Sequence, residues 1–241
     1  GELLDVLNPA TGEVIARAQL ADEKLADQAL QAAQKAFPAW SRKTAVERAD
    51  HLYRLVELIQ ENRERLARLI TTEQGKPLSE SDADIGMCCD LIRFAAEHLK
   101  IVRLELGGKA PFIVLDDADL DPAVDAAIAS RYNNCGQVCT CNQRMYVQSG
   151  IYDRFLERFK QRVEALKVGN PLTDKDVDMG PKINAAELDK IHKMVEHAQS
   201  QGAQLLTGGK RLTGGDYDKG NYYAPTILTN VNNDMDIMKQ E

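Results

Sequence analysis

Long hydrophobic runs and clusters of basic residues are both scarce in this chain of 241 residues. No apolar run approaches the roughly 20 residues that a membrane-spanning helix needs, so we expect no membrane partner. The 30 Lys and Arg residues are outnumbered by 37 Asp and Glu residues, which gives a formal net charge of -7. Because nucleic-acid binding requires clustered cations, we expect no nucleic-acid partner either.

A cysteine framework and a secretion signal are also lacking. Five cysteines form an odd and sparse set that fits a reducing compartment better than a disulfide scaffold. The first residues, GELLDVLNPATGE, show neither the basic region nor the apolar region of a signal peptide. We therefore expect a cytoplasmic protein. The hydrophobic fraction of 44% is large enough for a folded core.

The first 100 residues are predicted to be mostly helical. Residues 3–18 contain two turn-forming sites between apolar residues, which favours a strand hairpin. A helix with small apolar residues follows, and the FPAW sequence at 37–40 is predicted to mark its exit. Gly75-Lys76-Pro77 is predicted to end a later helix, and Ser79 to begin another that runs toward Lys100.

A capping box marks one helix start in this region. Thr44 and Glu47 have the three-residue offset at which two side chains satisfy each other's backbone amides. The apolar spacing behind them predicts one buried stripe. The predicted members of that stripe are Val46, Leu52, Leu55, Val56 and Ile59.

Strands and helices alternate after residue 100, which is typical of an α/β protein with a largely parallel sheet. The predicted strands are residues 101–106, 112–115, 145–148, 203–207 and 222–228, and the predicted helices are residues 119–128, 151–168 and 188–198. The glycine pairs at 107–108, 208–209 and 214–215 lack the spacing of a phosphate-binding motif, so we interpret them as turns.

Three stretches resemble the aldehyde dehydrogenase family: LELGGKAPFIVLDDADLD at 104–121, NCGQVCT at 134–140 and IMKQE at 237–241. Weaker agreement runs through TEQGKPL at 72–78 and MGPKIN at 179–184, in the order of the family. The CTC sequence at 139–141 and the VQSGIYDRF segment are most similar to enzymes that act on lactaldehyde or succinate semialdehyde. The resemblance thus covers both halves of the chain.

The resemblance implies a three-layer α/β fold with a largely parallel sheet and an incomplete Rossmann-like cofactor domain. Residues 1–100 would be the N-terminal helical part of the cofactor and oligomerisation domain. Residues 101–241 would be a catalytic domain truncated at its C-terminus. Family members form dimers or tetramers, so the resemblance also implies a homo-oligomer.

The implied reaction is the NAD- or NADP-dependent oxidation of an aldehyde to a carboxylic acid. Cys139 would supply the thiolate nucleophile, and Glu105 the general base that activates a water. Leu106 and Glu241 would contact the cofactor. The substrate would be a short aliphatic or hydroxy-aldehyde such as lactaldehyde.

Each of these residues also has a plainer interpretation. A free cysteine such as Cys139 is often a buried core residue, and Glu105 alone would suggest a solvated charge or an ion pair. Glu241, as the last residue, could be only an exposed terminal acid. Cys135 and Cys141 lie near Cys139 but lack a second cysteine pair or a histidine at ligand spacing, so we expect no metal site.

The junction of Lys100 with Ile101 falls where the family has most of its cofactor domain. An engineered deletion, a natural remnant and a sequence from which a stretch of the protein has been omitted would each explain it. The chain by itself could therefore be a remnant with only ester hydrolysis, or one with a structural or oligomerisation role.

Overall fold

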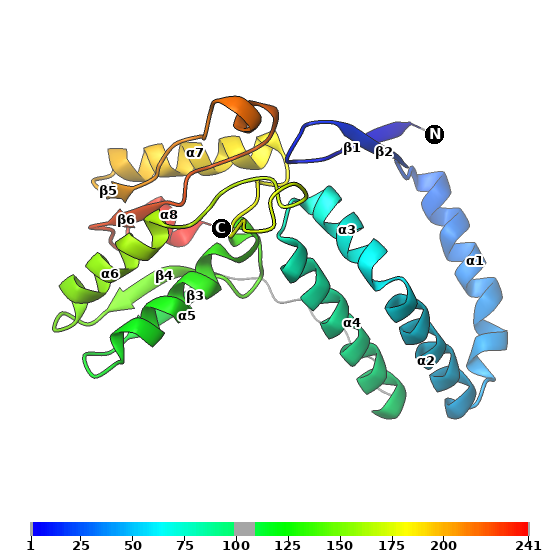
Figure 1. The fold of residues 1–241 in the computed structure, drawn as a ribbon. Helices are drawn as coiled ribbons and strands as arrows, with labels where there is room; N and C mark the ends of the chain where they lie inside the picture. The colour runs from blue at the N-terminus through cyan, green and yellow to red at the C-terminus, as the bar shows by residue number, and fades with distance from the viewer. Residues whose placement is uncertain (1, 99–108, 241) are drawn as a thin grey trace.

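The computed structural model describes residues 2–98 and 109–240, which form a helical N-terminal half and an α/β C-terminal half (Figure 1). The N-terminal half contains β1 (Leu3–Leu7), β2 (Val14–Gln19), α1 (Glu23–Ser41), α2 (Ala45–Glu61), α3 (Arg63–Gln74) and α4 (Leu78–His98). The C-terminal half contains β3 (Ala110–Val114), α5 (Leu120–Tyr132), β4 (Asn142–Val147), α6 (Tyr152–Glu164), α7 (Ala185–Ser200), β5 (Gln204–Thr207), β6 (Ile227–Thr229) and α8 (Asp236–Lys239). The predicted strand at 101–106 lies outside the described residues. No described helix is long and apolar enough to cross a membrane.

The N-terminal half follows its local signals closely. β1 and β2 pair antiparallel, which confirms the predicted hairpin. Gly75 ends α3 in the left-handed conformation with φ 78°, as a C-terminal cap requires. The predicted exit of α1 at 37–40 lies within one residue of the observed end at Ser41, although Pro38 itself is inside the helix. Nothing in α1 is buried.

The predicted capping box of α2 is confirmed. The Thr44 side chain accepts a hydrogen bond from the Glu47 amide at 3.3 Å, and the Glu47 carboxylate accepts one from the Thr44 amide at 2.7 Å. The reciprocal pair satisfies two amides that the first turn of a helix otherwise leaves without partners. The helix therefore begins where the sequence predicts.

Replacing Thr44 with Ala is expected to lower the free energy of unfolding by about 1 kcal/mol, because one amide of the first turn loses its acceptor. Urea denaturation followed by circular dichroism measures this loss. Val46→Ala is the control: Val46 is 70% exposed, so its truncation should change the stability by less than about 0.5 kcal/mol. Equal effects of the two changes would contradict the assignment.

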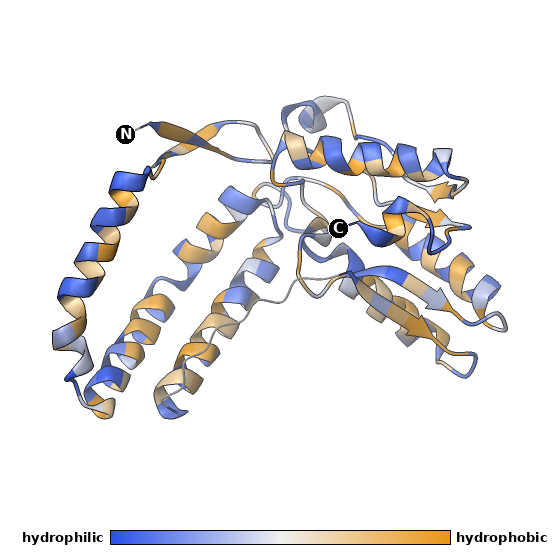
Figure 2. Cartoon of the chain, turned by 180° about the vertical axis from the view of Figure 1, so that it is seen from behind, coloured by the Kyte–Doolittle hydropathy of each residue, from blue (hydrophilic) through white to orange (hydrophobic). Residues whose placement is uncertain are grey.

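The predicted stripe of α2 is only partly buried. Val56 is buried and packs with Ala67, Ile85 and Cys89 where α2, α3 and α4 meet. Val46 and Leu55, by contrast, are 70% and 43% exposed. Orange, hydrophobic ribbon is visible along the helices of this half (Figure 2). The periodicity correctly indicates an apolar face, but the described residues cover only part of it.

The main core lies in the C-terminal half, between the β3–β4 pair and helices α5 and α6. β3 and β4 run parallel, with α5 as the connection between them. The other two strand pairs, β1–β2 and β5–β6, are antiparallel, so this one pair represents the predicted parallel sheet among the described residues. The buried residues of this core are Val114, Val124, Ala127, Tyr132, Ile151, Phe155, Phe159, Val163, Met179 and Ile227. Each large apolar side chain buried here contributes roughly 1.5–3 kcal/mol.

Two predicted boundaries are corrected in this half. The predicted strand at 222–228 is reduced to Ile227–Thr229, since Pro225 cannot donate to a ladder and Tyr223 forms only an isolated bridge with Arg211. The predicted helix at 151–168 ends at Glu164, because Val168 pairs with Met179 instead. Both segments are apolar because parts of them are buried, and not because one helix or one strand runs through their whole length.

Close backbone contacts join the two halves of the chain. A Cβ atom at Gly180 would lie 1.7 Å from the carbonyl oxygen of Gly75, so only glycine permits this approach. The amide of Asn221 donates to the Pro9 carbonyl at 3.0 Å, and the Tyr222 hydroxyl donates to the Ala10 carbonyl at 3.2 Å. The N-terminal hairpin and the end of α3 therefore rest directly on the C-terminal half.

Candidate active site

Cys139 lies in the connection between α5 and β4, shortly before β4 begins at Asn142. The Cys141 amide donates to the Val138 carbonyl at 3.1 Å, which closes a turn with Cys139 at its second position. Cys139 is exposed, whereas Cys141 is buried. The turn thus presents the Cys139 thiol and hides its near neighbour.

The backbone just before Cys139 is strained. Asn134, Cys135 and Gly136 have φ values of 46°, 57° and 75°, three consecutive residues in the left-handed region. Glycine adopts this conformation readily and asparagine tolerates it, but a cysteine there costs on the order of 1 kcal/mol or more. Such strain persists only where surrounding contacts impose it, and it is common at functional sites.

Hydrogen bonds from several elements hold this strained segment. The Asn134 and Gln137 side chains each donate to the other's backbone carbonyl, at 3.2 and 3.1 Å. The Gln137 side-chain oxygen accepts from the Ile183 amide at 3.0 Å. Arg131 donates to the Asn142 carbonyl at 3.4 Å and lies so close to Gly136 that a Cβ there would come within 3.0 Å of its guanidinium. The position of Cys139 is therefore fixed from both sides of the turn.

Glu80 of α4 links the N-terminal half to this segment. Its carboxylate accepts a hydrogen bond from the Asn134 amide at 3.0 Å. Burial raises the pKa of Glu80 to about 7, although nearby Lys76 and the Asn134 amide both act to lower it, and Asp84 raises it further. A carboxyl group that titrates near neutral pH thus contacts the turn that carries Cys139.

Glu80→Gln should remove a pH dependence of stability. Because the folded pKa is about 7 and the ordinary value is 4.5, the stabilisation from this group is fully present below about pH 4.5 and lost as the pH rises through about 7. The free energy of unfolding of the unmodified protein, relative to Glu80→Gln, should therefore fall between about pH 5 and about pH 8. Urea denaturation at both pH values measures the difference. A constant difference would contradict the assigned environment of Glu80.

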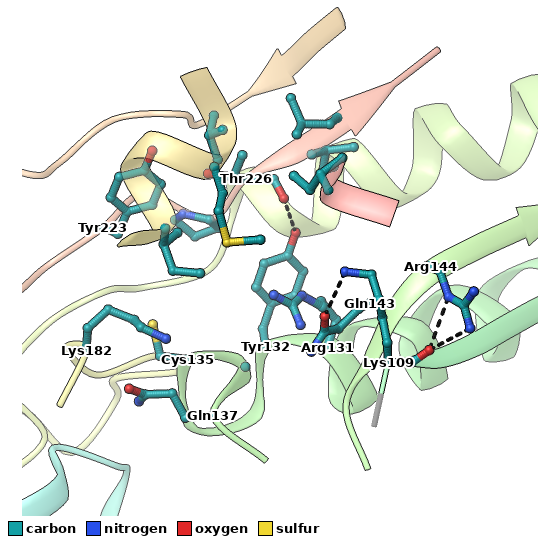
Figure 3. A pocket seen from close by; sticks show the side chains of 18 of the residues that line it. Lys109, Arg131, Tyr132, Cys135, Gln137, Gln143, Arg144, Lys182, Tyr223 and Thr226 are labelled. Carbon is teal, nitrogen blue, oxygen red and sulfur yellow. Dashed lines mark hydrogen bonds between the residues drawn. The ribbon is translucent and has the colours of Figure 1, made fainter. Parts of the chain in front are cut away.

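A cavity of about 770 Å³ opens beside Cys139 (Figure 3). Its volume lies within the range of known small-molecule sites, roughly 300–1,000 Å³. One wall is polar and includes Arg131, Gln137, Arg144 and Lys182. The remaining wall is largely apolar and includes Phe159, Met179, Ile191, Met194, Val195, Ile227, Leu228 and Ile237. The cavity combines an apolar surface, a few polar groups and an accessible thiol.

The other cysteines differ from Cys139 in their surroundings. Cys135, at the same cavity, is half-buried, and burial raises the pKa of its thiol. Burial also raises the pKa of Cys141, whose sulfur points at the Arg131 carbonyl 3.7 Å away. Cys88 is exposed on α4 and Cys89 is buried there. A search of residues 2–98 and 109–240 finds no group of three or more potential metal ligands.

Of the four predicted site residues, only Cys139 lies in the part of the chain that the structure describes. Cys139 lines the cavity as described, while Glu105, Leu106 and Glu241 lie outside the described residues. The sequence analysis missed Glu80 and Lys182, which the fold brings to the same region. Lys182 could have been noticed as a cation within the apolar MGPKIN segment; Glu80 carries no comparable signal.

The whole chain matches the sequence model of the aldehyde dehydrogenase family, in two segments that cover residues 1–101 and 95–241. The chain belongs to the aldehyde dehydrogenase family. The two matches meet at residues 95–101, where the sequence predicts a missing stretch. The family's fold is also confirmed by solved structures.

Among the relatives, a 3,6-anhydro-α-L-galactose dehydrogenase of Vibrio sp. (strain EJY3) is 54% identical over 151 residues. The match covers 63% of this chain and spans only 31% of that relative's length. The crystal structure of lactaldehyde dehydrogenase from Escherichia coli superposes with a TM-score of 0.92 at 27% identity, covering 99% of this chain and 76% of that one. The structure of a 3,6-anhydro-L-galactose dehydrogenase in complex with NAP gives a TM-score of 0.89 at 30% identity, with the same two shares covered.

Proposed function

We propose that the protein oxidises a short aliphatic or hydroxy-aldehyde, such as lactaldehyde, to the carboxylic acid with NAD or NADP. The observation that carries this proposal is the exposed Cys139 on the wall of a ligand-sized cavity. Among the cysteines at this cavity, Cys139 is the accessible one, as a nucleophile must be. The family membership and the named relatives give the proposal its reaction type.

In the proposed reaction the Cys139 thiolate adds to the carbonyl carbon of the aldehyde and forms a thiohemiacetal. A bound nicotinamide cofactor would supply the hydride acceptor that the oxidation of this carbon requires. The remaining thioester is attacked by a water whose proton passes to the Glu105 carboxylate, so that the thiolate leaves and the acid is released. One aldehyde, one oxidised cofactor and one water thus give one acid, one reduced cofactor and one proton.

The described residues fit the reacting end of such a cofactor. The apolar wall contributed by Met145, Met194 and Val195 suits a flat nicotinamide ring, and the volume of about 770 Å³ leaves room for a small aldehyde beside it. Leu106 and Glu241 are proposed as further cofactor contacts. The family membership, together with the structure of a relative in complex with NAP, supports NAD or NADP as the cofactor.

The proposal also covers the roles of the two halves of the chain, its oligomeric state and its cellular compartment. Residues 1–100 would serve cofactor binding and oligomerisation, and residues 101–241 catalysis, in a cytoplasmic homo-oligomer of two or four chains. The exposed apolar side chains of α1 support a partner surface, since Leu30 and Phe37 are 59% and 65% exposed.

The test is the absorbance of reduced nicotinamide formed from NAD and from NADP with lactaldehyde, glycolaldehyde and succinate semialdehyde. Formation of NADH or NADPH with any of them, in proportion to the protein added, is the expected result. If cofactor reduction is absent while nitrophenyl acetate is hydrolysed without cofactor, the chain is an esterase remnant. Absence of both activities would leave a structural or oligomerisation role.

A further inference from the structure

The charged lining of the cavity beside Cys139 is mostly cationic. The charged residues that line the cavity are Lys109, Arg131, Arg144, Lys182, Lys190 and a single carboxylate, Glu187. Five cations against one anion is the reverse of the whole chain, whose formal net charge is -7. A concave surface of one sign raises the local concentration of ligands of the opposite sign. The cavity is therefore suited to an anion.

Four of the five cations that line the cavity have polar partners in the protein. Nε and Nη2 of Arg144 both donate to the Lys109 carbonyl, at 3.1 and 2.8 Å (Figure 3). Arg131 donates to the Asn142 carbonyl at 3.4 Å, and the Lys190 ammonium lies 3.9 Å from the Glu187 carboxylate. Lys109 donates to the Gln143 side chain at 3.4 Å. Each of these four cations therefore already has a hydrogen-bond acceptor or an ion-pair partner in the protein.

Lys182 differs from all of them. It is only 7% exposed and lines the cavity, and within residues 2–98 and 109–240 its ammonium has no hydrogen-bond acceptor or ion-pair partner. Its side chain runs toward Cys135 in Figure 3. Burying a cation without a partner is costly, so an ammonium in this position strongly favours a ligand that supplies negative charge.

Arg131 lies on the other side of the same space. The Cys135 thiol experiences both the Lys182 and the Arg131 charge, and the Arg131 charge in turn acts on Lys182. Burial lowers the pKa of Lys182, Cys135 opposes this, and repulsion from Arg131 lowers it further. An anion bound between the two cations would offset their repulsion and favour the charged form of Lys182.

We propose that Lys182 and Arg131 bind the carboxylate of an aldehyde substrate, so that the preferred substrates are semialdehydes whose other end reaches Cys139. This inference rests on the proposed aldehyde oxidation. It assigns the anion to the substrate rather than to a cofactor phosphate, because the cavity that Lys182 lines also contains the nucleophile. Carboxylate and phosphate share the chemistry that two cations recognise, and the experiment distinguishes them.

The first experiment compares succinate semialdehyde with butanal, which has the same carbon chain without the carboxylate. In Lys182→Met, kcat/KM for succinate semialdehyde should fall about 10- to 100-fold, the effect of losing a charged hydrogen bond, while kcat/KM for butanal should change less than about threefold. Lys182→Arg should restore part of the loss. Lys193→Met is the matched control, since Lys193 is an exposed lysine of α7 that does not line the cavity; it should change both values less than about threefold.

Three outcomes would overturn the inference: equal losses for both aldehydes, no loss for either, or a loss expressed as a raised KM for NADP, which would assign Lys182 to a cofactor phosphate. A second measurement does not depend on turnover. Succinate alone, titrated calorimetrically into the whole chain, should bind at least about tenfold more weakly to Lys182→Met than to the unmodified protein or to Lys193→Met. If no aldehyde is oxidised but succinate binding depends on Lys182, the proposed function fails and the anion site stands. Equal succinate binding by Lys182→Met and the unmodified protein would remove the anion site.

Discussion

Cys139→Ala is expected to lower the rate of aldehyde oxidation by at least about a thousandfold, because the substitution removes the atom that forms the covalent adduct. The folded structure should be unaffected, since the Cys139 side chain is exposed and the turn is closed by the backbones of Val138 and Cys141. Cofactor reduction with lactaldehyde measures the rate, and urea denaturation measures the stability.

Two matched variants test whether the loss of activity is specific to Cys139 or follows the removal of any thiol. Cys135→Ala alters a half-buried thiol at the same cavity, and Cys88→Ala alters an exposed thiol on α4. Both should retain most of the activity, so the contrast with Cys139→Ala isolates the nucleophile. Iodoacetamide should inactivate the unmodified protein in step with labelling of Cys139. A Cys135→Ala variant that is inactive while Cys139→Ala is active would transfer the role to Cys135.

Gly180→Ala is expected to destabilise the protein by about 3 kcal/mol or more, at the upper end of what overpacking costs. The new methyl group would lie 1.7 Å from the carbonyl oxygen of Gly75, and backbone cannot move aside as a flexible side chain can. Because Gly75 ends α3 and Gly180 lies in the C-terminal half, the clash would separate the two halves. The midpoint of urea denaturation gives the loss, and reduced protection of the 133–141 segment in hydrogen exchange gives its location.

Gly86→Ala is the control for this prediction. Gly86 lies within α4, and the nearest side-chain atom to a methyl group there, Nη2 of Arg63, would be 3.7 Å away, which is ordinary contact. Removing a glycine from a helix interior should stabilise the protein by about 1 kcal/mol. Opposite signs for the two substitutions are expected; a tolerated Gly180→Ala would contradict the close approach of the two halves.

Local signals predicted the parts of the fold that depend on neighbouring residues. The Thr44–Glu47 capping box and the Gly75 cap act within one helical turn, and the structure confirms both. The FPAW sequence at 37–40 likewise lies at the end of α1, although the helix continues through Pro38 to Ser41. Tyr222 and Tyr223 are aromatic residues of the predicted strand at 222–228. Both are buried, but they precede Pro225 and lie outside β6, which begins at Ile227.

The candidate site shows the same difference between features that neighbouring residues determine and features that depend on the fold. Cys139 was found from the short motif that surrounds it, and its exposure agrees with the role predicted for it. Glu80 contacts Asn134 across 54 positions of the chain, and the Arg131 charge acts on Lys182 from a different segment. No spacing rule links residues so far apart, so these contacts required the fold.

The most direct test of the central claim is to find where the substrate becomes attached. The protein would be mixed with oxidised cofactor and succinate semialdehyde, quenched in acid during turnover, digested and analysed by peptide mass spectrometry. An acyl group on the peptide that contains Cys139, absent without cofactor and absent in Cys139→Ala, is the predicted result. Cofactor reduction that continues in Cys139→Ala, or an acyl group that maps to another cysteine, would contradict the account.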